Sequence, residues 1–232
     1  MLEGTATRND PAHVDRLAAL LRPVELFDFV HHICLWLQDA HEAAAELQPL
    51  RKNSHRGNWN NNTSFGTDRH QYLLNTAPSL HAFIPPMEID PAFQSVLLKL
   101  GQVGVYQFQT AAGPYGSLAD ASDLRRELMT FQEDGSLFSR RESWLAGRRL
   151  LLLPWSGAEE SGLTDTWAGE GVLVDNHIVW EWLVRLQDIA DDAHGGLGLT
   201  TTPDPVGPTL FEQPQPEIPL RPRAERSPAT GD

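Results

Sequence analysis

The longest apolar pattern in the chain runs from Val24 to about Gln48, and it constrains the fold more than any other feature. Its apolar side chains recur three or four positions apart, which is the spacing of one face of an α-helix. A helix of this length spans on the order of 35 Å, so it is expected to cross the whole domain and to end before Pro49. The apolar face consists of Leu26, Val30, Ile33, Leu37, Ala40, Ala44 and Leu47.

Further helical patterns occupy the rest of the N-terminal half. Segments 11–22 and 91–100 each follow an Asp-Pro pair, in which the aspartate can cap a helix and the proline can occupy its first turn. Segment 67–77 begins at Thr67, another residue type that caps helices, and stops before Pro78. These signals predict three helices in addition to the long one.

In the middle of the chain the hydrophobic period becomes that of β-strands. Residues 103–109 alternate in character along the chain, and 149–154 form a short apolar run that ends at a proline. Both segments are predicted to be strands. The segment 123–140 stays open between two interpretations, a helix over 123–132 and a hairpin with a tight Asp-Gly turn.

The C-terminal part is expected to contain a long loop, a last helix and a tail. Segment 155–171 is rich in Gly, Glu, Ser and Thr, which predicts a loop. Asp175 or Asn176 can then cap a helix whose apolar residues share one face as far as Ala193. From about Thr200 onward proline recurs among few large apolar residues, and this composition is typical of disorder.

Together these patterns predict an α+β fold. We expect a helix-rich N-terminal half with a long central helix, a small and mostly antiparallel sheet, a C-terminal helix and a disordered Pro-rich tail. Residues 1–199 are predicted to form a single globular domain, and residues 200–232 the tail.

Composition excludes several classes of protein and site. The single cysteine, Cys34, rules out disulfides within the chain and any metal site built from several cysteines. The formal net charge of −13 disfavours binding to the phosphate backbone of nucleic acids. No apolar run is long enough to span a membrane, and the N-terminus lacks the order of a signal peptide, so a cytoplasmic location is expected.

The polar run from Asn53 to His70 is the strongest candidate for a working surface. Its amides offer both donors and acceptors, and its aromatic rings could stack on a flat ligand. The alternative is a surface loop that hydrogen-bonds its own backbone and anchors Trp59 in the core. The candidate ligand-binding residues are His55, Arg56, Asn58, Trp59, Asn60, Asn61 and Arg69.

The end of this run also suggests acid–base chemistry. His70 could act as a general base and Asp68 as the carboxylate that orients it, with Arg56 or Arg69 stabilising developing negative charge. No serine lies in a G-x-S-x-G context, so a nucleophilic triad of that kind is not predicted.

A second set of candidates lies on the long helix, where His31, Cys34, Gln38 and His41 share one stripe that could line a pocket. His31 and His41 are separated by roughly 15 Å of helical rise, so they cannot share a metal ion, and no metal site is predicted. The alternative is that these residues are packed and hydrogen-bonded in the core. Gly169-Glu-Gly171 lacks the third glycine of a dinucleotide loop, and no other pattern identifies a cofactor.

The sequence therefore favours a cytosolic protein that binds a small polar or anionic ligand through the segment 53–70. One alternative is a hydrolase-like enzyme that uses His70 and Asp68 with Arg56 or Arg69. Another is a regulatory or structural module that binds a protein partner through its acidic surface or its Pro-rich tail. Membrane and nucleic-acid partners are not expected.

Overall fold

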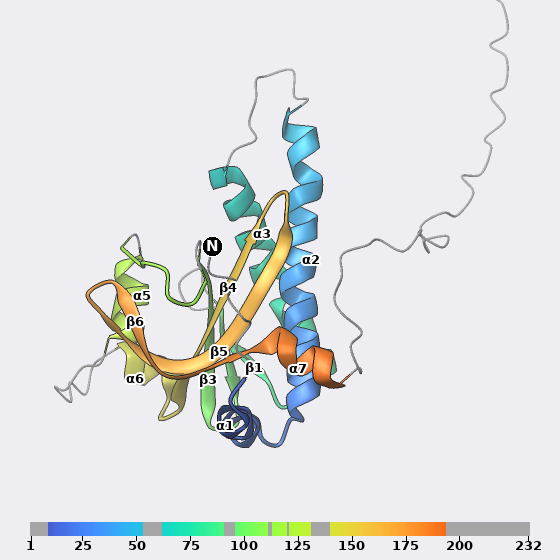
Figure 1. Cartoon of the computed structure of the whole chain (residues 1–232). Coiled ribbons are helices and arrows are strands. Elements are labelled where there is room, and N and C mark those ends of the chain that lie inside the picture. The colour runs from blue at the N-terminus through green and yellow to red at the C-terminus, as the bar shows by residue number, and fades with distance from the viewer. Residues whose placement is uncertain are drawn as a thin grey trace, which may run out of the picture. The chain divides into compact units, whose positions relative to one another are not determined.

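The long apolar pattern forms α2 (Leu26–Lys52), the longest helix in a computed structural model of the chain. Figure 1 shows α3 (Asn62–Thr76) running back alongside it, so the two form a helical hairpin. Pro49 lies inside α2 rather than after it, because its missing N–H removes only one hydrogen bond near the helix end. The structure describes residues 9–52, 62–90, 96–110, 113–119, 121–130 and 140–193.

The remaining N-terminal helices are short. Asp10 caps α1 (Pro11–Leu21) by accepting a hydrogen bond from the backbone N–H of Ala12, as its Asp-Pro pair predicts. After α3 the chain continues through the 3₁₀ turn η1 (Ala77–Ser79) and the single helical turn α4 (Leu80–Phe83).

A six-stranded sheet follows, and its strands lie side by side in chain order. All neighbours are antiparallel except β3 and β4, which are parallel, so the prediction of a mostly antiparallel sheet is confirmed. The parallel pairing brings the carboxyl ends of β3 and β4 to the same edge of the sheet. The strands are β1 (Glu88–Asp90), β2 (Leu97–Leu100), β3 (Val103–Gln109), β4 (Arg149–Ala158), β5 (Gly162–Val174) and β6 (His177–Arg185).

Helices cover both faces of this sheet (Figure 1). One hydrophobic cluster joins α1, α2 and α3 to a face that includes Val105 of β3. The other joins Leu128 of α5 (Asp123–Met129) and Leu145 of α6 (Arg140–Leu145) to the opposite face, which includes Phe108 of β3. Because β3 is buried on both faces, its side chains divide between the two clusters.

Three expectations from the sequence are wrong in detail. The last part of the helix predicted over 91–100 is instead strand β2, which pairs with β3, and residues 91–95 lie outside the described residues. The loop predicted over 155–171 is instead the end of β4 and much of β5. Only the last part of the predicted C-terminal helix is helical, as α7 (Leu186–Ala193), because β6 occupies the positions before it.

A tight turn explains the last of these corrections. Asp175 and Asn176 both have positive φ angles, 47° and 66°, so they form the two-residue turn of a β-hairpin rather than a helix cap. The question left open over 123–140 is settled in part, because α5 is a helix capped by Ser122. Residues 131–139, the Pro-rich tail and the candidates from His55 to Asn61 lie outside the described residues.

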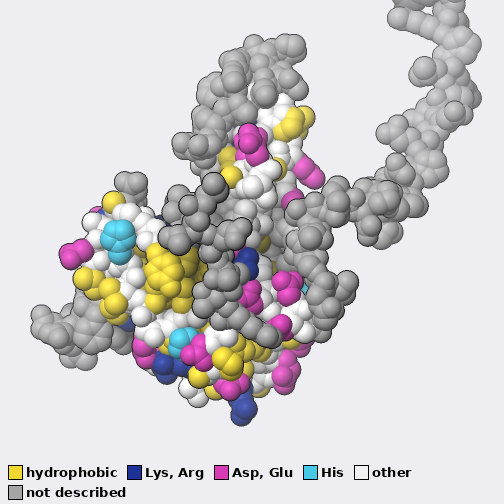
Figure 2. Space-filling model, in the orientation of Figure 1, with side chains coloured by type: hydrophobic (Ala, Val, Ile, Leu, Met, Phe, Trp, Pro, Cys, Tyr) yellow, Lys and Arg dark blue, Asp and Glu magenta, His cyan; other side chains and the backbone are white. Residues whose placement is uncertain are grey.

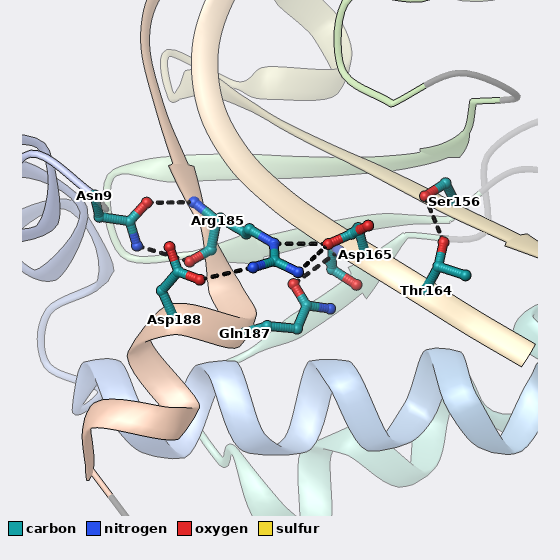
Figure 3. A network of polar contacts seen from close by, with 8 residues as sticks. Asn9, Ser156, Thr164, Asp165, Arg185, Gln187 and Asp188 are labelled. Atoms are coloured by element: carbon teal, nitrogen blue, oxygen red, sulfur yellow. Dashed lines mark hydrogen bonds and ion pairs between the residues drawn. The ribbon is translucent and has the colours of Figure 1, made fainter. Parts of the chain in front are cut away.

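Polar contacts fasten the start of the described chain to its last strand (Figure 3). The side-chain amide of Asn9 both donates to and accepts from the backbone of Arg185, each at 2.8 Å. The Arg185 guanidinium in turn binds Asp165 of β5 and Asp188 of α7. Burial acts to lower the pKa of Arg185, but the ion pairs with Asp165 and Asp188 outweigh it, so the pKa is raised. The network therefore holds the segment before α1, strand β5 and helix α7 against the C-terminal end of β6.

A second polar cluster joins α1 to the sheet through Glu170 of β5. This buried carboxylate accepts from Arg16 of α1 at 2.7 Å, from Arg149 of β4 at 2.5 Å and from the indole of Trp182 at 2.7 Å. Arg16 also pairs with the exposed Glu181. Because Glu170 is buried, the two arginines and the indole compensate the cost of removing its charge from water.

Candidate functional site

A pocket of about 240 Å³ lies where α3 crosses the carboxyl ends of β3 and β4. Two arginines, a histidine and two glutamines face it, together with three aromatic residues, and no carboxylate is among the lining residues that the structure describes. The lining consists of Gly66, Arg69, His70 and Leu73 of α3, Tyr106, Gln107, Phe108 and Gln109 of β3, Arg125 of α5, and Trp155 of β4.

The sheet topology explains why a pocket forms at this place. Strand β2 pairs with β3 only as far as Leu97, which lies opposite Tyr106. Beyond that pair, residues 107–109 of β3 have β4 as their only paired neighbour within the described parts of the chain. All three residues line the pocket, so it occupies the edge that β2 leaves uncovered.

Arg69 is the most buried charged residue of this pocket, with 3% of its surface exposed. Its guanidinium lies between two aromatic rings, 4.4 Å from the ring centre of Trp155 and 5.0 Å from that of Phe65. Burial lowers the pKa of Arg69 to about 10. The side chain therefore remains positively charged at neutral pH.

Arg69 directs its side-chain hydrogen bonds to neutral acceptors. One N–H group donates to the side-chain oxygen of Gln109, and another faces Nδ1 of His41 at 3.4 Å. Gln109 in turn donates to the backbone carbonyl of Gly157. Within the described residues Arg69 forms no ion pair with a carboxylate, so its charge is not balanced by an acidic side chain there.

His41 of α2 contacts the Arg69 guanidinium through its imidazole ring. Its Nε2 lies 2.8 Å from the carbonyl oxygen of Ala158, and because a carbonyl only accepts, Nε2 carries the proton. In the neutral ring Nδ1 is then an acceptor and can take a hydrogen bond from Arg69. Burial, followed by the positive charge of Arg69, lowers the pKa of His41, which favours this neutral form.

Arg125 approaches the pocket from the other face of the sheet. Its Cζ lies 5.6 Å from the ring centre of Phe108, and its Nε donates to the hydroxyl of Tyr106 at 3.4 Å. Gln107 lies on the Arg69 side, where its side-chain oxygen accepts from the indole of Trp155 at 2.8 Å. The pocket thus has a guanidinium on each side of β3.

Arg69 and His70, two residues of the predicted surface, both line the pocket. Asp68, predicted to orient His70, forms an ion pair with Arg51 of α2 at 2.5 Å. Residues two apart on a helix point in different directions, and here the neighbouring carboxylate serves the contact between α3 and α2. The candidates His55, Arg56, Asn58, Trp59, Asn60 and Asn61 lie outside the described residues.

The predicted stripe on α2 does not line this pocket. His31 packs against Phe27 and His32, and Gln38 donates to Glu42. Cys34 is buried in the core, and burial raises the pKa of its thiol to about 12. Of the four residues, His41 is the one that reaches the site, through Arg69.

Sequence reasoning missed Gln107, Gln109, Arg125 and Trp155. One signal was available for the glutamines, because they continue the alternation of Val103 and Val105, which face the α2 side. A polar residue at a position that should face the core indicates a specific partner or a site. Arg125 and Trp155 carried no comparable signal.

No protein-family model matches the chain, and comparisons with curated proteins and with solved structures found no significant similarity. None of the helices that the structure describes is long and apolar enough to cross a membrane. In the same parts of the chain, no three His, Cys, Asp or Glu side chains come together in a group that could hold a metal ion.

Proposed function

We propose that the protein binds a small anionic ligand in the pocket between α3 and the ends of β3 and β4, with Arg69 as the main ligand-binding residue. The observation that carries this proposal is the burial of the Arg69 guanidinium beside a pocket whose described lining residues include no carboxylate. His70 faces the same pocket and can add a hydrogen bond to the ligand.

The energetic argument starts from the cost of burying a charge. A guanidinium removed from water needs hydrogen-bond acceptors and a counter-charge, and buried charges in proteins are usually paired. Gln109, His41 and two aromatic rings stabilise Arg69, but each of them is neutral when His41 is deprotonated. An anion in the pocket would supply the missing negative charge in surroundings that strengthen the attraction.

The charge distribution supports the same conclusion. The chain carries a net charge of −13, and acidic side chains appear at many places on the face shown in Figure 2. Among the residues described around this pocket there are two arginines and no acidic side chain, so the local charge has the opposite sign to that of the whole chain. Such a reversal favours anions at one site while the rest of the surface disfavours them.

Calorimetric titration of the full chain with inorganic phosphate and with short carboxylates tests the proposal. We expect binding of at least one of these anions, and a loss of about tenfold or more in affinity for Arg69→Gln, since a hydrogen bond to a charged group contributes about 1.5–3 kcal/mol. Arg22→Gln is the matched control, because it makes the same change of charge at an exposed position. Equal affinities for the two variants would contradict the role of Arg69.

A further inference from the structure

The two arginines of the pocket belong to opposite faces of the sheet. Side chains alternate along β3, so Gln107 and Gln109 point to the α2 side, whereas Tyr106 and Phe108 point to the α5 side. Arg69 contacts Gln109 on the first side, and Arg125 lies over Phe108 on the second. Both nevertheless line one pocket, because it wraps around the edge of β3 that β2 leaves uncovered.

A ligand that fills this pocket therefore meets positive charge at two separate places. A single small anion bound to Arg69 would leave Arg125 on the far side of β3 without a negative partner in the ligand. The stretch between the guanidiniums is lined by the edge of β3 and by aromatic rings, which suit a short apolar link better than a third charge.

The size of the pocket limits the length of that link. A volume of about 240 Å³ compares with the ~30 Å³ that one water molecule occupies in the liquid. The pocket can therefore hold a ligand of on the order of eight to ten non-hydrogen atoms. A short aliphatic chain with a carboxylate at each end has this size.

We infer that the ligand carries two anionic groups joined by a short apolar chain, with one group bound by Arg69 and the other by Arg125. This inference rests on the proposed function and adds the class of ligand. Short dicarboxylates are the simplest members of that class, and both of their carboxylates are ionised at neutral pH.

The test compares dicarboxylates with monocarboxylates of the same chain length. The full chain is titrated by calorimetry at pH 7.5 with glutarate and adipate, and in parallel with pentanoate and hexanoate. We expect the better dicarboxylate to bind at least about tenfold more tightly than its monocarboxylate, as a second charge-assisted contact predicts. Circular dichroism and thermal unfolding of each variant confirm that it is folded.

Two variants test which arginine binds each anionic group of the ligand. In Arg125→Gln the dicarboxylate is expected to bind no more tightly than the monocarboxylate. In Arg69→Gln the affinities for the dicarboxylate and for the monocarboxylate both fall, because the anionic group bound at position 69 loses its partner. Arg22→Gln should leave the tenfold preference for dicarboxylates unchanged.

The possible failures are distinguishable. Equal affinities for monocarboxylates and dicarboxylates in the unmodified protein would overturn the inference of a ligand with two anionic ends and leave the proposed function standing. A preference for dicarboxylates that persists in Arg125→Gln would overturn the assignment of the second end. If neither these acids nor inorganic phosphate binds, the inference and the proposed function both fall.

Discussion

The guanidinium of Arg69 lies 4.4 Å from the ring centre of Trp155, and the indole N–H of Trp155 donates to Gln107. Trp155 thus contacts the proposed ligand-binding arginine through its ring face, and its indole N–H orients the side-chain amide of Gln107. Since Trp155 belongs to β4 and Arg69 to α3, this contact also joins the helical layer to the sheet at the site.

The two roles of Trp155 can be separated by substitution. Trp155→Phe keeps an aromatic ring near Arg69 and removes the donor to Gln107, whereas Trp155→Leu removes both. We expect glutarate to bind about fivefold more weakly to the Leu variant than to the Phe variant, because a cation–π contact contributes roughly 0.5–2 kcal/mol. Calorimetric titration of the two variants measures the difference. Identical affinities would mean that the ring does not support the bound state of Arg69.

Asp68 is expected to matter for stability and not for ligand binding. Its ion pair with Arg51 joins α3 to α2, and both side chains are partly exposed, so Asp68→Asn should cost about 0.5–1 kcal/mol of unfolding free energy. Affinity for the anionic ligand should stay within about twofold. Denaturant unfolding and calorimetry measure the two quantities. A large loss of affinity with unchanged stability would instead favour the acid–base role of Asp68.

The neutral state of His41 predicts how stability depends on pH. Burial and Arg69 lower the pKa of His41 in the folded protein below its ordinary value of 6.5, although Glu42 and the carbonyl of Ala158 act in the opposite direction. As the pH falls through 6.5, the unfolded chain takes up this proton before the folded protein does, so folding free energy is lost. The loss ends once the pH drops below the folded pKa.

Denaturant unfolding from pH 8 to pH 5 checks this dependence. The unmodified protein should lose more stability over that range than His41→Gln, whose amide can still accept from Arg69. His32→Gln is a useful comparison, because the pKa of His32 is also lowered, mainly by burial, but its ring lies against Phe83 and away from the pocket. Parallel pH curves for the unmodified protein and His41→Gln would show that His41 does not titrate as stated.

The buried carboxylate of Glu170 is expected to stabilise the contact of α1 with the sheet. Glu170→Gln retains an acceptor for Trp182 but weakens two charge-assisted contacts, so we expect a loss of about 1–3 kcal/mol in unfolding free energy. Glu181→Gln, which alters only the exposed contact with Arg16, should cost less than about 0.5 kcal/mol. Urea unfolding of both variants measures the two losses of stability. A larger loss for Glu181→Gln than for Glu170→Gln would contradict this expectation.

The turn at Asp175 provides a test of the corrected hairpin. Its φ of 47° is unfavourable for a β-branched side chain, so Asp175→Val should cost about 1–2 kcal/mol of stability. Asp175→Asn should be neutral or slightly stabilising, because asparagine is preferred in this type of turn. Urea unfolding of both variants measures these changes, and a valine variant as stable as the asparagine variant would contradict the strain expected at this turn.

The sequence predicted the fold class because a hydrophobic period that continues over a long segment is a strong signal of secondary structure. The apolar face of α2 identifies the helix without help from the rest of the chain. Strands β2 and β6 are shorter than α2, and positions such as Ile178 and Trp182 fit a helical face as well as a paired strand. Pairing with β3 and β5 decides the outcome there, and pairing partners cannot be read from local spacing.

The site was predictable only in part for a related reason. Arg69 and His70 lie within one polar run of the sequence, so composition alone pointed to them. Gln109, Arg125 and Trp155 join them only because β3 and β4 are parallel, with α5 and α6 lying between the two strands in the chain. That arrangement collects side chains from distant parts of the chain at one edge of the sheet, and no short motif records it.

The attachment of Asn9 to Arg185 spans 176 residue positions. During synthesis on the ribosome, the first helix emerges long before the strand that holds it has been translated. Until the last hairpin leaves the exit tunnel, the apolar side chains of α1 therefore lack their contacts with β6. Completion of that hairpin supplies the contact of α1 with β6, so a chain arrested before residue 177 should leave its N-terminal helix more accessible to proteases or chaperones.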